Sequence, residues 1–98
     1  MSILNIVLNA VKEYGNENEN TNLINADEKT ALFGKNLDSM GILSLVSEIE
    51  ERVFDDLDVD IVLADERAMS QKTSPFLNIK SLADYIEFLI AEARENNS

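Results

Sequence analysis

The sequence contains no cysteine and no histidine among its 98 residues. Without cysteine, the chain has no disulfide, no thiolate metal ligand and no thiol nucleophile of its own. Without histidine, it lacks the side chain that most often acts as a general base near neutral pH and that often binds metals. We therefore expect a protein that is not an enzyme, and any thiol chemistry must come from a group attached to the chain.

Long apolar runs are also missing. No stretch approaches the length of about 18 apolar residues that a membrane-spanning helix needs. The apolar segment 3–11 is interrupted by Asn5 and Asn9 and has no basic leader, which argues against a secretory signal peptide. The sequence thus predicts a cytoplasmic protein with no stable membrane insertion.

Positive charge is scarce: the chain has 8 Lys and Arg residues and 19 Asp and Glu residues, which gives a formal net charge of -11. Such a surface repels phosphate backbones, so we expect no nucleic-acid partner. It attracts proteins that carry a basic patch, and this attraction speeds encounter more than it tightens the complex. Acidity that only keeps a small protein in solution explains the composition equally well.

What the sequence does contain predicts one all-α domain. An apolar content of 45% suits a single modest core, so residues 1–98 are expected to form one domain with frayed ends at 1–2 and 96–98. Apolar residues spaced by three and four predict helices over 3–14, from 39 to about 54, and from 78 or 81 to about 94. A short helix over 65–70 and an extended crossover at 59–63 complete a small four-helix bundle with three longer helices and one short one.

The same spacing predicts the ends of the helices and the residues of the core. Gly15 is expected to end the first helix, and 16–22 to be a solvated loop within the long connection 15–38. Ser81 and Asp84 have the spacing of a capping box. Residues expected to face the core include Met40, Leu43, Leu45 or Val46, Ile49 and Val53, then Leu32 or Phe33, Ile61 or Leu63, and Phe76, and in the last helix Ile79, Leu82, Ile86, Leu89, Ile90 and Ala93.

An acidic run at 56–60 has the alternating spacing of a calcium-binding loop. In that loop the sixth position needs glycine and the twelfth needs a bidentate carboxylate. Counted from Asp56, these positions hold Ile61 and Arg67. The sequence therefore predicts no specific metal site here.

Ser39 stands where the long connection meets an acidic amphipathic helix. Asp38 and Ser39 are both residue types that cap helix N-termini and favour the positive end of the helix dipole. The string Leu37-Asp38-Ser39-Met40 resembles the Asp-Ser-Leu motif of the acyl and peptidyl carrier proteins. The resemblance covers most of the chain, is strongest from Leu32 to Leu89, and includes a terminal helix that contains 82–86. The segments 64–70 and 74–76 are similar to those of discrete bacterial carriers outside housekeeping fatty-acid synthesis.

The resemblance implies a four-helix carrier whose Ser39 receives 4'-phosphopantetheine from coenzyme A through a phosphopantetheinyl transferase. An acyl-activating ligase or synthase would load the arm, and an acyltransferase or condensing enzyme with a basic docking patch would take the cargo from a monomeric carrier. Asp38 would help the transferase and its magnesium ion engage the serine. The residues implied in partner binding are Met40, Ser44, Glu48, Glu51 and Asp55. The residues that could surround a fatty cargo are Val46, Ile49, Met69 and Ile86, for which core packing is the alternative.

Two residues depart from the pattern of fatty-acid carriers. Gly41 weakens the first turns of the helix or accepts a close approach, and Ser44 replaces an acidic residue found in many of those carriers. Both put standard fatty-acid-synthase partners in doubt. The alternatives that remain are a peptidyl or D-alanyl carrier that uses the same serine, and an unmodified acidic helical adaptor in which Ser39 is only a helix cap. Asp38 is then a second capping carboxylate, and Met40 a core residue.

Overall fold

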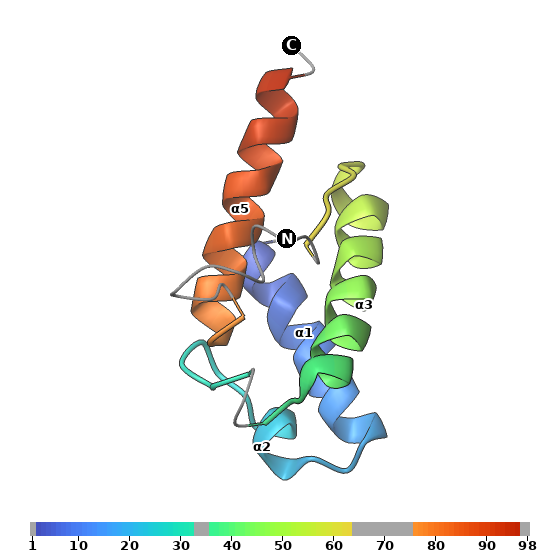
Figure 1. Cartoon of the computed structure of the whole chain (residues 1–98), viewed down its shortest axis with the longest axis vertical. Helices are drawn as coiled ribbons and strands as arrows, with labels where there is room; N and C mark the ends of the chain where they lie inside the picture. Colours follow the sequence, from blue (N-terminus) through green and yellow to red (C-terminus); the bar gives the residue numbers. More distant parts are fainter. Residues whose placement is uncertain (1, 33–35, 64–75, 97–98) are drawn as a thin grey trace.

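The structure is a computed structural model that describes residues 2–32, 36–63 and 76–96, without the side chains of Ser39 and Asn96. Within these ranges the chain forms four α-helices and no β-strand: α1 (Ile3–Glu17), α2 (Thr21–Ile24), α3 (Ser39–Leu57) and α5 (Ile79–Asn96). The first helix, α1, packs against the other three and runs antiparallel to α3 and α5 (Figure 1). The predicted small all-α bundle with three long helices is confirmed. The short helix expected over 65–70 lies outside the described residues.

The end of α1 differs from the prediction, because the helix continues through Gly15 to Glu17. It ends in a Schellman turn, in which the N–H of Asn20 donates to the carbonyl of Gly15 at 2.8 Å and the N–H of Glu19 donates to that of Asn16 at 3.4 Å. Glu19 has a φ of 54°. The left-handed position that glycine usually fills after a helix is therefore taken by Glu19.

The helix α2 replaces part of the loop expected at 16–22. Asn20 caps it, since its side chain accepts a hydrogen bond from the N–H of Leu23 at 3.3 Å. Leu23 is fully buried and lies against Gly15. A β-carbon on Gly15 would lie 2.6 Å from the Cβ of Leu23 and 2.8 Å from the N of Ile24. Glycine is needed inside α1 for this close approach, which is why interpreting it as a helix end was wrong.

The helix α3 begins at Ser39 as predicted and continues three residues beyond Phe54 to Leu57. It ends at Asp58, whose φ is 54° and whose N–H donates to the carbonyl of Phe54 at 2.9 Å. Its buried apolar side chains are those of Ile42, Leu45, Val46, Ile49 and Val53. Met40 and Leu43 were expected in the core but are 77% and 47% exposed. Successive residues turn by about 100° around a helix, so a stripe that starts at Ile42 leaves both outside its edge.

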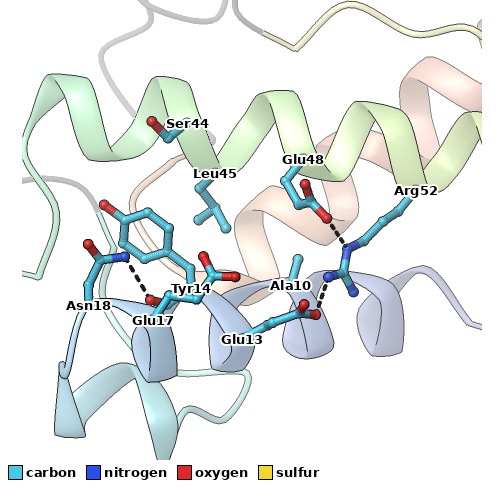
Figure 2. Close-up of a pocket in the computed structure, with 9 residues that line it drawn as sticks. All are labelled: Ala10, Glu13, Tyr14, Glu17, Asn18, Ser44, Leu45, Glu48 and Arg52. Carbon is cyan, nitrogen blue, oxygen red and sulfur yellow. Dashed lines mark hydrogen bonds and ion pairs between the residues drawn. The ribbon is translucent and has the colours of Figure 1, made fainter.

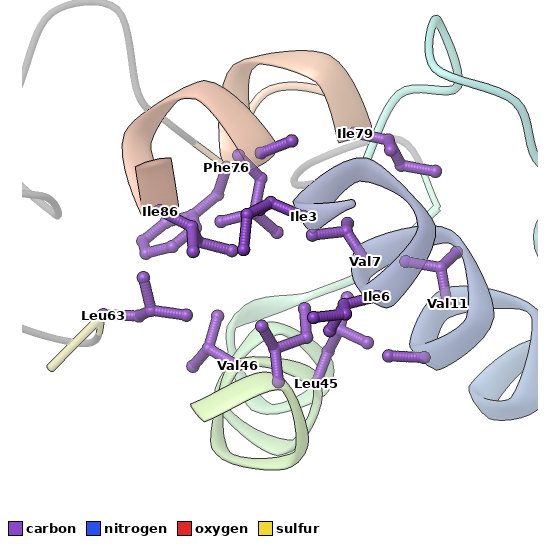
Figure 3. Packing of buried hydrophobic residues seen from close by; sticks show 14 of the residues in the cluster. Ile3, Ile6, Val7, Val11, Leu45, Val46, Leu63, Phe76, Ile79 and Ile86 are labelled. Carbon is purple, nitrogen blue, oxygen red and sulfur yellow. The ribbon is translucent and has the colours of Figure 1, made fainter. Parts of the chain in front are cut away.

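One cluster of buried apolar side chains joins the helices and their connections (Figure 3). Phe76 is 1% exposed and lies with Leu63 between α5 and α3, which confirms its predicted place in the core. Ile61 and Leu63 are buried while Val62 between them is exposed, as expected of an extended crossover. The carboxylate of Glu50 accepts a hydrogen bond from the N–H of Leu63 at 2.7 Å and fastens this crossover to α3. Full burial of each large apolar side chain stabilises the fold by about 1.5 to 3 kcal/mol.

The middle of the first connection is bonded to the start of α5. The N–H of Ile79 donates to the carbonyl of Thr30 at 3.2 Å, and the N–H of Lys80 donates to that of Glu28 at 2.9 Å. The N–H of Leu32 donates to the carbonyl of Leu77 at 2.9 Å. Leu32 is fully buried, in agreement with the prediction for Leu32 or Phe33, of which the second lies outside the described residues.

The cap of α5 also differs from the prediction. The N–H of Ser81 donates to Oδ1 of Asn78 at 2.8 Å, and the N–H of Asn78 donates to Oγ of Ser81 at 3.1 Å. The capping box expected between Ser81 and Asp84 is therefore wrong, since Asp84 pairs with Lys80 at 3.2 Å. The apolar face of α5 is as predicted, with five residues buried and Ala93 half-buried: Ile79, Leu82, Ile86, Leu89 and Ile90. No helix in the described ranges has the length and apolar character to cross a membrane.

Candidate attachment and docking site

Ser39 is the first residue of α3, and Asp38 is the residue that caps it. Oδ1 of Asp38 accepts a hydrogen bond from the N–H of Gly41 at 2.8 Å, and the carbonyl of Asp38 accepts one from Ile42 at 2.9 Å. The N-cap position of α3 thus belongs to Asp38, and Ser39 is the first helical residue after it. The alternative in which Ser39 is only the N-cap of this helix does not fit that position.

The start of α3 keeps a backbone N–H group open. Within the described ranges no acceptor is bonded to the N–H of Met40, the second residue of the helix. At the same place in α5, the N–H of Lys80 donates to the carbonyl of Glu28. An open N–H at a helix start, together with the helix dipole, favours a bound anion. The first turn of α3 can therefore stabilise a negative group placed beside it, whereas the start of α5 is already bonded to the first connection.

The residues expected to bind partners lie on one exposed face of α3. All five are exposed, at positions spaced by three and four along the helix: Met40, Ser44, Glu48, Glu51 and Asp55. The 77% exposure of Met40 decides against the alternative that it packs in the core. Two apolar residues beside this face, Leu43 and Phe54, are 47% and 51% exposed and were missed. The apolar spacing had placed Leu43 in the core, and the predicted helix ended at about Phe54.

Glu48 differs from the other acidic residues of this face because it has a partner within the chain. Its Oε1 accepts a hydrogen bond from Nε of Arg52 at 3.0 Å, and Arg52 also pairs with Glu13 of α1. The hydrogen bond to Glu13 is the main reason why the pKa of Arg52 is raised, and burial opposes that shift. No basic side chain in the described part of the chain pairs with Glu51 or Asp55. These two carboxylates are the ones that remain open to a partner.

A groove of about 360 Å³ lies between α1 and α3 (Figure 2). Ser44 and Glu48 line it from α3, and Tyr14 and Glu17 line it from α1. Ser44, which the sequence assigned to the partner-binding face, therefore also belongs to this groove. The phenol ring of Tyr14 stands between the two helices at the end of the groove near the start of α3 (Figure 2). The sequence had placed Tyr14 only at the end of the helix predicted over 3–14.

Neither a metal centre nor a cargo site is defined by the remaining candidate residues. Among the described residues, no group of three or more acidic, histidine or cysteine side chains gathers closely enough to hold a metal ion. Three of the residues considered for a cargo wall are fully buried in the core, as core packing expects: Val46, Ile49 and Ile86. The fourth, Met69, lies outside the described residues.

Comparisons of the chain with protein-family models, with curated proteins and with solved structures find no match. The resemblance to acyl carrier proteins therefore rests on the residues around Ser39 and on the order of the segments along the chain.

Proposed function

We propose that the chain is an acyl carrier protein that holds an acyl group as a thioester on 4'-phosphopantetheine attached to Ser39. The observation that carries this proposal is the place of Ser39, which opens α3 directly after its capping residue Asp38 and at the end of a long connection. The neighbouring residues Asp38 and Met40 are both exposed, so a transferase can approach this end of the helix. The rest of the helix then offers a surface on which partners dock.

The chemistry of attachment suits this position. The Ser39 hydroxyl oxygen attacks the β-phosphorus of coenzyme A, 3',5'-adenosine diphosphate leaves, and the hydroxyl proton is lost. The new phosphodiester is an anion beside the open N–H of Met40. Such an anion at an exposed helix start is stabilised by about 0.3 to 1 kcal/mol. The arm ends in a thiol, which is the nucleophile that a chain without cysteine lacks.

The exposed face of α3 suits brief contacts with several enzymes. Glu51 and Asp55 are open to basic side chains of a partner, and Met40 offers an apolar contact beside the attachment residue. Exposed ion pairs contribute about 0 to 1 kcal/mol each, so a few of them steer docking without making the complex long-lived. Weak docking is what a carrier needs to pass between a transferase, an acyl-activating ligase or synthase, and an acyltransferase or condensing enzyme in the cytoplasm. The pathway served is one of fatty-acid, polyketide, lipid or specialised-metabolite biosynthesis.

Intact-mass measurement after incubation with coenzyme A and a broad-specificity phosphopantetheinyl transferase tests the proposal. We expect the wild-type chain to gain one phosphopantetheine and the Ser39→Ala variant to gain none. Ser47→Ala is a matched control, because Ser47 is an exposed serine two turns further along α3. It should be modified like the wild type.

Each other result has a definite meaning. If the folded wild-type chain gains no mass, the carrier function is wrong, and an unmodified acidic adaptor explains the acidic face of α3 better. If Ser39→Ala still gains an arm, the attachment residue is wrong. A peptidyl or D-alanyl carrier would give the same masses as an acyl carrier and is separated by the cargo: incubation of the modified chain with amino-acid ligases and with fatty-acid ligases shows which class of thioester forms.

A further inference from the structure

Gly41 on α3 lies buried beneath Tyr14 of α1 at the start of the groove. A β-carbon on Gly41 would lie 3.0 Å from the phenol oxygen of Tyr14, 3.1 Å from Cδ2 of Leu37 and 3.3 Å from Oδ1 of Asp38. All three distances are tighter than ordinary van der Waals contact. A side chain at position 41 therefore requires the phenol, Leu37 or the carboxylate of Asp38 to shift by a few tenths of an ångström.

The close approach explains why glycine stands in the first turn of α3. Glycine lowers helix stability relative to alanine, so its presence needs a reason. The backbone of Gly41 is not left-handed, because its φ angle is not positive. The reason is therefore the contact with Tyr14, which brings α1 and α3 together at this end of the bundle.

The same residue holds the cap of the attachment helix. The N–H of Gly41 donates to Oδ1 of Asp38 at 2.8 Å, so the residue that touches Tyr14 also fixes the carboxylate directly before Ser39. The backbone next to Tyr14 is held in place, because the following residue, Gly15, is in close contact with Leu23 of α2. A continuous set of contacts thus runs from α2 through Tyr14 and Gly41 to the turn that carries Ser39.

We propose that Tyr14 and Gly41 are positioning residues for the loading of Ser39: their contact fixes the backbone of the first turn of α3, from which Ser39 is presented to the transferase. This inference rests on the proposed carrier function and adds the residues that control its loading step. Transfer of a phosphoryl group needs the attacking oxygen in line with the leaving group, and a displacement of about 1 Å can slow such a step by about 100-fold. A loosened or displaced first turn therefore lowers the rate of transfer more than it weakens binding of the transferase.

Steady-state kinetics of arm transfer from coenzyme A test the inference with three variants. Gly41→Ala inserts the clashing methyl group, Tyr14→Leu removes the ring, and Tyr14→Phe keeps the ring without its hydroxyl. We expect Gly41→Ala and Tyr14→Leu to lower kcat by about tenfold or more with KM changed by less than about threefold. Tyr14→Phe should also lower kcat, by less than Tyr14→Leu, because it removes only the phenol oxygen that lies over Gly41 and keeps the ring.

A control separates positioning from general loss of stability. Leu8→Ala removes a half-buried side chain from the same helix, about 9 Å along α1 from Tyr14 and away from the start of α3. It should lower the urea midpoint and leave kcat and KM of the folded chain unchanged. Amide hydrogen exchange gives a second readout: the Gly41 N–H should exchange faster in Tyr14→Leu than in Leu8→Ala at equal unfolding free energy.

Folded Gly41→Ala and Tyr14→Leu chains that load with wild-type kcat would overturn the inference while the carrier function stands. A loss of rate no larger than that of Leu8→Ala at equal stability would overturn it as well, because the contact would then serve only the fold. Absence of loading in the wild-type chain would instead overturn the carrier function and this inference together. Should Gly41→Ala fail to fold, Tyr14→Leu and its comparison with Tyr14→Phe decide alone.

Discussion

The guanidinium of Arg52 on α3 bonds to the carboxylate of Glu13 on α1, 39 residues earlier in the chain. The same guanidinium bonds to Glu48 one turn back on α3. One cation therefore joins two helices through two carboxylates at the edge of the α1–α3 groove. In a chain of net charge -11 this contact removes part of the repulsion between two acidic helix faces.

The pair predicts a measurable coupling between Glu13 and Arg52. In a double-mutant cycle with Glu13→Gln and Arg52→Gln, we expect a coupling of about 0.5 to 1 kcal/mol, because the side chains are 59% and 25% exposed and solvent screens the pair. Urea unfolding at low and high salt measures it, and the coupling should shrink as salt rises. Since the pKa of Arg52 is raised, its contribution is fully present below the ordinary arginine pKa and is lost only in strongly alkaline solution. A coupling of zero at low salt would show that the pair does not stabilise the fold.

Gly15→Ala should destabilise the protein strongly. The added methyl group would lie 2.6 Å from the Cβ of Leu23 and 2.9 Å from its carbonyl carbon, so α2 must move away from α1. Overpacking of this kind costs about 1 to 3 kcal/mol, more than the gain in helix propensity returns. Urea denaturation followed by circular dichroism gives the change. A Gly15→Ala chain more stable than the wild type would mean that α2 does not pack here.

Glu19→Gly should stabilise the protein by about 0.5 to 1 kcal/mol. Glu19 holds a left-handed backbone at φ 54°, a conformation that costs side-chain-bearing residues energy and glycine almost none. Lys12→Gly is the control, because Lys12 is an exposed residue inside α1, where glycine should destabilise by about 1 kcal/mol. Glu19→Gln removes the charge without changing the backbone preference. If it stabilises as much as Glu19→Gly does, charge rather than conformation is the cause.

Substitutions of Asp38 separate its two expected roles. Asp38→Ala removes the acceptor for the Gly41 N–H and should cost about 1 kcal/mol of stability. Asp38→Ser keeps a capping oxygen and should stay within a few tenths of a kcal/mol of the wild type. If the carboxylate also helps the transferase and its magnesium ion, Asp38→Ser loads more slowly although its unfolding free energy is unchanged. Equal loading of the wild type and Asp38→Ser would leave the carboxylate with the capping role alone.

Local patterns predicted the long helices well. The start of α3 follows from Asp38 and the apolar stripe behind it, and the buried face of α5 follows from residues spaced by three and four. The four residues of α2 have one buried side chain, Leu23, and a single turn is too short to show a period. Gly15 was misplaced for a related reason: its neighbour in space is α2, and nothing in the sequence near Gly15 indicates that contact.

The sequence motif of the candidate site could be predicted, but the residues that surround it in space could not. Asp38 and Ser39 stand together in the sequence, so their place at a helix start could be inferred. The role of Met40 could not be assigned from the sequence, since an apolar side chain on a helix can pack in the core or contact a partner. Only its exposure in the structure distinguishes the two roles. Tyr14 was missed as a neighbour of Gly41, because the two residues meet only through the packing of α1 on α3.

The bonds between residues 28–32 and 77–80 have a consequence for the order in which this protein takes shape on the ribosome. Besides its local turn bonds, that part of the first connection has three backbone hydrogen bonds that join it to residues at or beyond Leu77. A chain emerging from its N-terminus can form α1, α2 and α3 while these partners are still unmade. The stretch ahead of the serine-bearing helix therefore acquires its final course last, once the opening turn of α5 has been synthesised.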